Sequence, residues 1–302
     1  MSKERLEMIQ KRKKQRRNRQ IIKLGLIIVG LVLVMLLIVS GINAAINAVK
    51  KAIHTPTPTP VQVISQSVIA QSSQMPKPTS IPDATEENDM LKIIEASQTE
   101  SKVCYLTFDD GPNKSITPLI LDILRKYNIK ATFFQVGTLI EEYPDISKRV
   151  YEEGHLIGNH SYSHTYDKIY YDKNSFIDEF NKCAQLIQSI TGDDYFPIVR
   201  FPGGGHNTGK YGQLKQSLKT ILAENNVYHC DWNSLNGDAE STTRTSEQLL
   251  ERVKSTTKNK NKIVLLMHDA SSKKQTVNAL PAIIEYLISE NYSFARLDEH
   301  LN

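Results

Sequence analysis

Hydrophobic and polar residues follow three different patterns along this 302-residue chain. Residues 25–42 form an apolar run without a charge, and the next charged residue is Lys50. The following segment is rich in proline, serine, threonine and glutamine, and after it short apolar runs alternate with segments of helical periodicity. These patterns predict four parts: a basic arm (1–24), a transmembrane helix (25–49), a stalk or linker (50–100) and a folded domain (101–302).

The apolar run is long enough to span a membrane. Twenty-six residues separate Lys23 from Lys50, and at ~1.5 Å per residue a helix of that length covers about 39 Å, more than the ~30 Å hydrocarbon core. The 24 residues before the run contain ten lysines and arginines and two glutamates. The positive-inside rule then predicts a single-pass protein of the cell membrane, with its N-terminus in the cytoplasm and its folded domain outside. The alternative is a cleaved signal peptide, although no clean small-x-small cleavage site follows the run.

The net charge of the chain, +4, combines a very basic arm with a slightly acidic remainder. Residues 1–24 carry +8, and the other 278 residues carry 27 basic and 31 acidic side chains. A basic stretch such as KRKKQRR could bind nucleic acid or act as a nuclear address. Because it directly precedes the predicted span, we interpret it as a topology signal and expect no nucleic-acid partner.

The predicted stalk has the composition of an extended, solvated segment. Six of the twelve prolines lie between Pro56 and Pro82, and such a sequence favours polyproline-like conformations over a packed core. About fifty residues at ~3.1 Å each would reach up to about 150 Å if fully extended. We expect a spacer that holds the folded domain away from the membrane, with a possible short helix at Asp89–Ser97.

The folded domain shows alternating strand and helix patterns. Predicted strands are Val103–Phe108, Ala131–Val136, Leu156–Asn159, Ile198–Phe201, Val227–Asp231, Ile263–His268 and Ser293–Leu297. Predicted helices are Thr117–Tyr127, Ser147–Glu153, Ser175–Ile190, Leu214–Glu224, Glu247–Lys254 and Ala279–Ser289. This alternation indicates a parallel α/β fold, either a barrel or an open sheet. With 40% hydrophobic residues, the composition excludes a disordered, collagen-like or disulfide-scaffold protein. The three cysteines are expected to be buried free thiols.

Polar residues recur at the carboxyl ends of the predicted strands. They are Asp109-Asp110, His160, Arg200, Asp231-Trp232 and His268. In parallel α/β folds the loops at that edge converge to form a site. The sequence therefore predicts one composite site built from five loops.

The residue types of this site suit metal-assisted hydrolysis. One carboxylate of the Asp109-Asp110 pair together with His160 and His164 offers three ligands and an open position, as catalytic zinc sites do. The other carboxylate could act as a general base, and His268 could supply the opposing proton. Arg200 could hold the basic carboxylate ionised. The predicted cofactor is a divalent metal, Zn²⁺ first, with Co²⁺, Fe²⁺ or Ni²⁺ as alternatives.

Five segments, in this order and spacing, resemble one known family. They are TFDDGP (107–112), ATFFQVG (131–137), EEGHLIGNHSYSH (152–164), RFPGG (200–204) and LLMH (265–268). The chain resembles the NodB-homology polysaccharide deacetylases, carbohydrate esterase family 4, over roughly residues 100–302. The resemblance implies a distorted (β/α)7 barrel and metal-dependent hydrolysis of N-acetyl or O-acetyl groups on sugars.

The resemblance also implies a role for individual residues. Asp109 corresponds to the catalytic base, His268 to the catalytic acid, Arg200 to the arginine that orients the base, and Asp238 to the aspartate that tunes the acid. The implied metal ligands are Asp110, His160 and His164. The implied substrate contacts are Pro202, Gly203, whose N–H helps to hold the oxyanion, Trp232 and Leu266.

Two positions depart from the family pattern. Ala239 stands where many members have a tryptophan, and Gly203 replaces a common aromatic residue. A wider or differently lined acetate pocket follows from these changes.

We therefore expect a membrane-anchored enzyme that removes acetyl groups from N-acetylglucosamine residues of cell-wall peptidoglycan. The same chemistry on exopolysaccharide, N-acetylmuramic acid, chitin oligomers or O-acetylated xylan is the alternative. A more remote alternative is an inactive, tethered glycan-binding protein. The sequence leaves the oligomeric state open.

Overall fold

The structure is a computed structural model that describes residues 88–97 and 101–301. None of the helices within those two ranges is long and apolar enough to cross a membrane. The predicted basic arm (1–24), transmembrane helix (25–49) and most of the stalk (50–100) lie outside the described residues. The described residues cover the predicted folded domain up to Leu301 and the last part of the predicted stalk.

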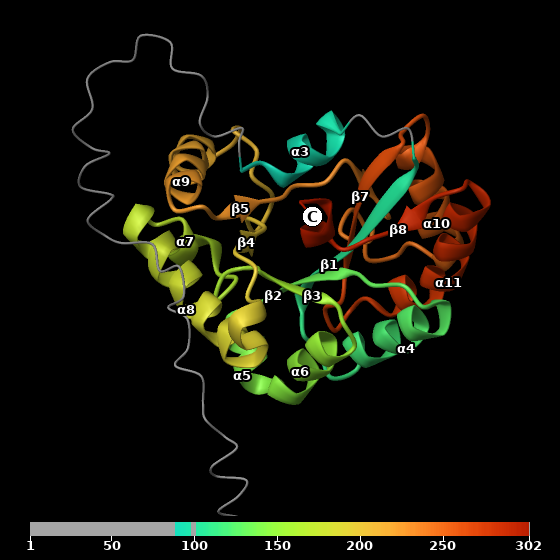
Figure 1. Cartoon of the computed structure of the whole chain (residues 1–302), viewed down its shortest axis with the longest axis horizontal. Helices are drawn as coiled ribbons and strands as arrows, with labels where there is room; N and C mark the ends of the chain where they lie inside the picture. The colour runs from blue at the N-terminus through green and yellow to red at the C-terminus, as the bar shows by residue number, and fades with distance from the viewer. Residues whose placement is uncertain (1–87, 98–100, 302) are drawn as a thin grey trace, which may run out of the picture. The chain divides into compact units, whose positions relative to one another are not determined.

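Eight strands form one curled sheet at the centre of the fold (Figure 1). All of the strand pairings are parallel, the main path runs β5-β4-β3-β2-β1-β7-β6, and β8 pairs with the start of β1. The strands are β1 (Val103–Gly111), β2 (Thr132–Gln135), β3 (Leu156–Asn159), β4 (Ile198–Val199), β5 (Tyr228–His229), β6 (Ser234–Leu235), β7 (Lys262–His268) and β8 (Ser293–Phe294).

The predicted parallel α/β architecture is confirmed, and two details of the predicted seven-stranded barrel are corrected. Each of the seven predicted strands is present, but β6 adds an eighth beside β7. The sequence did not reveal β6 because two residues among polar neighbours give no apolar run. The hydrogen-bonded path also ends at β5 and β6, which do not pair with each other in the described chain. The sheet is therefore a curled half-barrel, open between these two strands.

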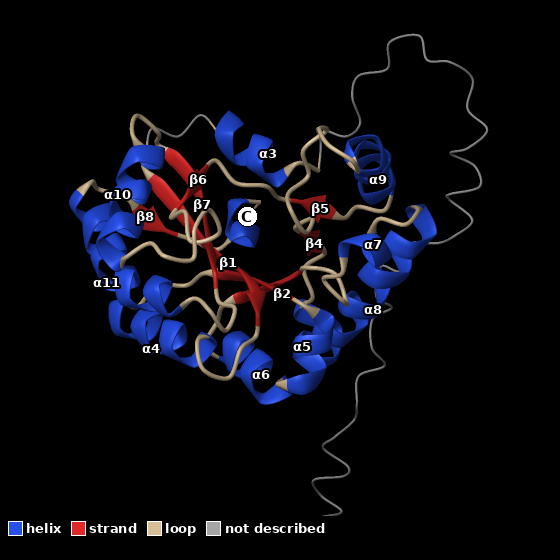
Figure 2. Ribbon diagram, turned by 180° about the vertical axis from the view of Figure 1, so that it is seen from behind, coloured by secondary structure: helices blue, strands red, loops and turns tan. Residues whose placement is uncertain are grey.

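Helices cover the outside of the curled sheet (Figure 2). All six helices predicted in the folded domain are present, and α3 confirms the short helix expected at Asp89–Ser97. Helices α5 and α7 are additional and too short to show a helical repeat. The helices are α3 (Met90–Ala96), α4 (Thr117–Tyr127), α5 (Gly137–Glu142), α6 (Pro144–Glu152), α7 (Tyr166–Ile169), α8 (Lys173–Thr191), α9 (Gly212–Glu224), α10 (Ser246–Thr257) and α11 (Lys274–Ser289).

The sheet is buried on both faces, which explains its continuous apolar strand sequences. On β1, Leu106 and Phe108 pack in the outer core against the helices. Tyr105 points to the opposite face and belongs to the inner cluster with Phe134 and Val264. Because side chains alternate along a strand, Thr107 and Asp109 share the inner face with Tyr105. The three cysteines are buried free thiols, as expected.

Helix α3 belongs to the same fold although it lies in the predicted stalk. Its Met90 and Ile94 are fully buried in the inner cluster. Just before the helix, the Asn88 carbonyl accepts a hydrogen bond from His229 N at 3.0 Å, so the chain pairs with β5 there. Near its end, Glu95 accepts a hydrogen bond from Asn233 Nδ2 at 2.8 Å, next to β6. The helix therefore bridges the two edge strands of the open sheet (Figure 2).

Candidate active site

The two adjacent aspartates at the end of β1 both reach the carboxyl edge of the sheet. Successive residues of a regular strand point to opposite faces. Here the pairing of β1 with β2 shifts register between Asp109 and Gly111, and Asp110 has a left-handed φ of 73°. This β-bulge redirects the Asp110 side chain, so that both carboxylates serve one site.

Asp110, His160 and His164 lie together in a cluster of the kind that binds a metal. Their candidate ligand atoms are all within 4.8 Å of one another, and Asp110 Oδ1 lies 3.4 Å from His160 Nε2 and 3.1 Å from His164 Nε2. His160 Nδ1 lies 2.8 Å from the Arg200 carbonyl oxygen, to which it can only donate. That bond fixes the tautomer and leaves the Nε2 lone pair facing the cluster, as metal-ligating histidines require. The donor set therefore fits a divalent cation.

The electrostatics of Asp110 favour its ionised form. Burial by itself would raise the pKa of this carboxyl group, but the contacts with His160 and His164 outweigh burial and hold it well below the ordinary value. An ionised carboxylate beside two imidazole nitrogens is the state in which this group binds a cation.

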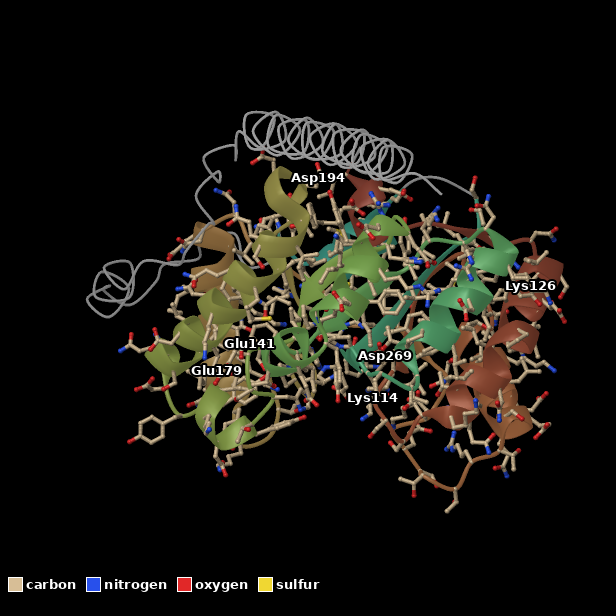
Figure 3. The ribbon with its side chains drawn as sticks, turned by 90° about the horizontal axis from the view of Figure 1, so that it is seen from below. Lys114, Lys126, Glu141, Glu179, Asp194 and Asp269 are labelled. Carbon is tan, nitrogen blue, oxygen red and sulfur yellow. The ribbon has the colours of Figure 1, made fainter. Side chains whose placement is uncertain are left out.

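The loop that carries the two histidines is fixed from both sides. Ser163 N donates to Glu179 Oε2 at 2.6 Å, and Tyr162 Oη donates to Glu141 Oε2 at 2.8 Å. Figure 3 shows Glu141 and Glu179 on the side of the domain away from Asp194. His164 itself has a left-handed φ of 54°. The ligand positions therefore depend on contacts with α5 and α8 as well as on the loop sequence.

Arg200 lies fully buried directly after β4 and holds Asp109 in place. Its Nη1 donates to Asp109 Oδ1 at 2.9 Å and to Thr107 Oγ1 at 2.7 Å. Its other nitrogens donate to the backbone carbonyls of Cys230 at 2.9 Å and Asp231 at 3.2 Å. Asp109 is only 3% exposed, so this arginine both balances its charge and orients its second oxygen towards the metal cluster, 3.8 Å from His160 Nε2.

His268 lies on the other side of β1, paired with Asp109 in the register of β1 and β7. Its Nδ1 lies 2.7 Å from Asp238 Oδ1, and its backbone N donates to Asp238 Oδ2 at 3.0 Å. Burial lowers the pKa of His268, but the Asp238 contact, with smaller effects of Asp109 and Asp110, raises it above the ordinary value. The imidazole is therefore held in its protonated form at higher pH than a free histidine.

The loop after β4 forms a tight turn that is linked to the metal cluster through Tyr166. Gly204 N donates to the Phe201 carbonyl at 2.7 Å, which closes a turn with Pro202 and Gly203 at its centre. Gly203 has a φ of 74°, as the third position of a type II turn requires. A Cβ on Gly203 would lie 2.7 Å from Tyr166 Oη. The Tyr166 ring in turn packs edge-on against His164, with a centroid separation of 5.9 Å, so Tyr166 links the turn to the metal ligands.

The two remaining predicted substrate contacts line the same region. Leu266 is 6% exposed and lies two residues before His268 on β7, hence on the same face of the sheet. Trp232 lies near the turn, because a Cβ on Gly204 would approach its ring to 3.1 Å. The structure thus brings all of the predicted site residues to one edge of the sheet.

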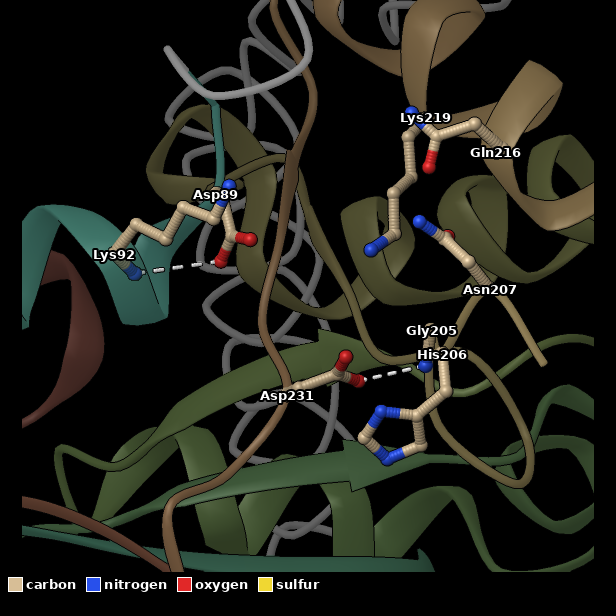
Figure 4. Close-up of a pocket in the computed structure, with 8 residues that line it drawn as sticks. All are labelled: Asp89, Lys92, Gly205, His206, Asn207, Gln216, Lys219 and Asp231. Atoms are coloured by element: carbon tan, nitrogen blue, oxygen red, sulfur yellow. Dashed lines mark hydrogen bonds between the residues drawn. The ribbon is translucent and has the colours of Figure 1, made fainter. Parts of the chain in front are cut away.

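A polar pocket of about 240 Å³ lies beside the turn (Figure 4). Asp231 Oδ1 accepts a hydrogen bond from Gly205 N at 2.7 Å on one wall, and Lys219 extends from α9 on another. The lining residues are Asp89, Lys92, Gly205, His206, Asn207, Gln216, Lys219 and Asp231. Since Arg200 contacts both Asp109 and Asp231, one guanidinium group separates this pocket from the predicted catalytic carboxylate.

Sequence reasoning missed several residues of the site. Tyr166 follows the second histidine by two positions, and its place in the HSYSHTY segment is a signal that could have identified it. Asp269 follows His268 directly, is fully buried, and accepts a hydrogen bond from Thr117 Oγ1 at 2.6 Å. Burial raises the pKa of Asp269 to about 7. Its position under the β1 bulge follows from the pairing of β1 with β7 and could not be found from the sequence.

Comparison with known proteins agrees with this geometry. Residues 96–219 match the family model described as polysaccharide deacetylase. A peptidoglycan-N-acetylglucosamine deacetylase of Bacillus cereus is 34% identical over 209 residues, which cover 66% of this chain and 71% of that protein.

Solved structures give the same result. The catalytic domain of the peptidoglycan N-acetylglucosamine deacetylase of Eubacterium rectale is 36% identical, with a TM-score of 0.61, covering 66% of this chain and 90% of that structure. A CE4 esterase of Streptococcus mutans is 31% identical with a TM-score of 0.61, and the match covers 68% of this chain and 89% of that structure. The chain therefore belongs to the polysaccharide deacetylases of carbohydrate esterase family 4, which are enzymes of hydrolytic deacetylation.

Proposed function

We propose that this protein is a metal-dependent deacetylase that acts on N-acetylglucosamine residues of cell-wall peptidoglycan. The observation that carries the proposal is that two groups of polar side chains meet at one edge of the sheet. One is the Asp110–His160–His164 cluster, and the other is the buried Asp109–Arg200 pair next to the Asp238–His268 pair. Together they offer a cation site, a base and an acid, which are the three requirements for amide hydrolysis.

The residues of the chain have distinct roles in the proposed reaction. Asp110, His160 and His164 would hold a divalent cation, which would act as a Lewis acid on the acetyl carbonyl and on water. Asp109, oriented by Arg200, accepts the proton of the attacking water. His268 begins as an imidazolium and donates its proton to the departing sugar amine. The donor set accepts Zn²⁺ and also Co²⁺, Fe²⁺ or Ni²⁺.

The turn after β4 and its surroundings bind the acetyl group in this proposal. The exposed N–H of Gly203 donates to the oxygen that becomes negatively charged during the attack. Pro202, Trp232 and Leu266 form walls around the acetyl group and the sugar. The polar pocket beside the turn offers hydrogen-bonding groups to the hydroxyls of a neighbouring sugar, which suits a polymeric glycan.

The substrate and location rest on two supports. Relatives at 34% and 36% identity are named peptidoglycan N-acetylglucosamine deacetylases. The predicted span at residues 25–49, with the basic arm before it, would anchor the protein in the cell membrane and place the enzyme outside, next to the wall. Protease digestion of intact protoplasts would test this topology: a C-terminal tag should be lost while an N-terminal tag stays protected.

Metal analysis combined with acetate-release assays tests the function. We expect the full chain in detergent to bind one divalent ion and to release acetate from peptidoglycan, with activity lost to a chelator. Asp110→Asn should lose both metal and activity, whereas Asp145→Asn, an exposed carboxylate on α6, should lose neither. Full activity of Asp110→Asn would refute the metal site. Mass mapping of digested peptidoglycan shows whether N-acetylglucosamine or N-acetylmuramic acid has lost its acetyl group. Chitin oligomers, acetylated xylan and exopolysaccharide are assayed as the alternative substrates.

A further inference from the structure

The peptide between Pro202 and Gly203 is held by two buried side chains from other parts of the fold. Its carbonyl oxygen accepts a hydrogen bond from Tyr170 Oη at 2.8 Å and a longer one from Lys215 Nζ at 3.4 Å. The same ammonium group donates to the Gly204 carbonyl at 2.5 Å. Two of the carbonyls of this turn are therefore drawn towards the interior of the protein.

Both donors are buried beside groups that accept their hydrogen bonds or face their charge. Tyr170 is 3% exposed, and burial raises the pKa of its hydroxyl far above the ordinary value, so it remains a donor. Lys215 is 6% exposed, and its ammonium group also lies 4.7 Å from the centre of the Tyr170 ring. Burial lowers the pKa of Lys215, but Asp231 opposes this effect, and the ring face and two carbonyls stabilise the charge.

Fixing the carbonyl also fixes the N–H of the same peptide. The peptide unit is planar, and in its trans form the C=O and N–H point in opposite directions. With the Pro202 carbonyl turned inwards, the Gly203 N–H must point outwards. Gly203 is exposed, and its N–H donates to no acceptor among the described residues. It is therefore an unpaired, oriented donor on the turn that packs against Tyr166 and, through that ring, against His164.

We propose that Tyr170 and Lys215 are positioning residues that aim and polarise the Gly203 N–H as the oxyanion donor of the deacetylase. The inference rests on the proposed function and adds to it two residues that do not touch the substrate. Donors on the carbonyl strengthen the peptide dipole, since hydrogen bonds in a chain polarise one another. Because the donor is already oriented before the reaction, little reorganisation is needed when the negative charge develops.

Kinetics of two conservative variants test the proposal. Tyr170→Phe removes only the hydroxyl, and Lys215→Met removes the ammonium group while keeping the chain length. We expect kcat to fall about 10-fold in each, with KM changed less than about two-fold, because the contact acts in the transition state. Removing an oxyanion donor outright costs about 100-fold or more, and here the donor remains but is less well aimed. The double variant should lose less than the product of the two, since both act on one peptide.

Matched controls exist at the opposite end of the sheet. Lys262→Met also removes a buried ammonium group that donates to a backbone carbonyl, that of Ser101. Tyr292→Phe also removes a buried hydroxyl that donates to backbone carbonyls, those of Lys260 and Thr257. Lys262 is six residues before His268 on β7, about 20 Å away. An equal fall of kcat in these controls would overturn the proposal, because general destabilisation would then explain the effect.

A spectroscopic readout is independent of activity. Pro202–Gly203 is the only Pro–Gly peptide in the sequence. Labelling the full chain with [¹³C′]proline and [¹⁵N]glycine therefore selects one amide signal. We expect Tyr170→Phe and Lys215→Met to move the Pro202 carbonyl resonance upfield, with no change in the controls.

The kinetic and spectroscopic readouts together distinguish a failure of the proposed function from a failure of the positioning role. If the wild-type chain releases acetate from no glycan, the proposed function is refuted, and the carbonyl resonance still tests the contact with Tyr170 and Lys215. An unchanged resonance in both variants overturns the positioning role. A shifted resonance with unchanged kcat overturns it as well, since the orientation would then have no effect on catalysis.

Discussion

Replacing Asp238 by asparagine tests the proton donor of the proposed mechanism. Asp238 Oδ1 lies 2.7 Å from His268 Nδ1, while its Oδ2 accepts hydrogen bonds from His268 N at 3.0 Å and Thr276 Oγ1 at 2.7 Å. An asparagine fills the same volume but has no charge and only one acceptor oxygen. If this oxygen accepts from the imidazole, the new NH₂ group takes the place of Oδ2 and faces His268 N and Thr276 Oγ1, which are themselves donors. We expect unfolding free energy to fall by about 1–3 kcal/mol, the cost of an unsatisfied buried donor.

The larger effect concerns the pKa of His268, which Asp238 raises above the ordinary value. Two unit charges about 4 Å apart interact by about 4 kcal/mol at an effective dielectric constant near 20. Asparagine keeps one hydrogen bond to the ring but loses this charge interaction, so we expect the pKa of His268 to fall. A bound cation would lower the pKa in both proteins, and the difference between them would remain.

The pH dependence of kcat/KM for acetate release measures this shift. A general acid works while it is protonated, so activity falls as the pH rises through its pKa. In Asp238→Asn the alkaline limb should move to lower pH, and the loss of activity should be smaller at acidic pH. The Asp145→Asn variant should keep the wild-type profile. An alkaline limb that does not move, or a loss that is equal at every pH, would refute the assignment of His268 as the acid.

Three further predictions follow from buried contacts. Gly111→Ala would place a Cβ 2.1 Å from Asp269 Oδ2, so we expect the free energy of unfolding, measured in urea, to fall by about 3 kcal/mol or more. An unfolding midpoint equal to that of the wild type would contradict the packing under the β1 bulge. Met90→Ala should destabilise the protein by about 2–5 kcal/mol because Met90 is fully buried, and an unchanged midpoint would show that α3 is not part of the cooperative fold. Arg200→Lys keeps the charge but cannot make hydrogen bonds in four directions; we expect acetate release to fall about 100-fold, and near-normal activity would contradict its role in orienting the base.

The main elements of the fold could be predicted from local patterns. Apolar runs predicted seven of the eight strands, and helical periodicity predicted six of the helices, because burial on both faces of the sheet leaves a strong local signal. Strand β6 lies among polar neighbours and gives no apolar run, and helices α5 and α7 are too short to show a helical repeat. Helix α3 is a different case, since its two buried residues, Met90 and Ile94, lie in a segment whose composition resembles that of a linker.

The candidate site was also predicted in part from the sequence, and in part it depends on the folded structure. The residue types and their places after strands predicted a cation site with a base and an acid. The structure adds the β-bulge that turns Asp110 towards Asp109 and the carbonyl of Arg200 that fixes the His160 tautomer. The predicted membrane span, the stalk and the substrate remain predictions.

The sequence by itself determined the fold class, the family and the set of reactive side chains, because these depend on periodicity and on motifs short enough to read along the chain. Only the tertiary structure decided how those side chains are held. Tyr170 and Pro202 are 32 positions apart, and His268 and Asp238 are 30 apart. Such contacts arise when the sheet curls and its loops meet, and no local pattern encodes them. The orientation of one peptide N–H and the protonation of one imidazole therefore depend on the folded chain as a whole.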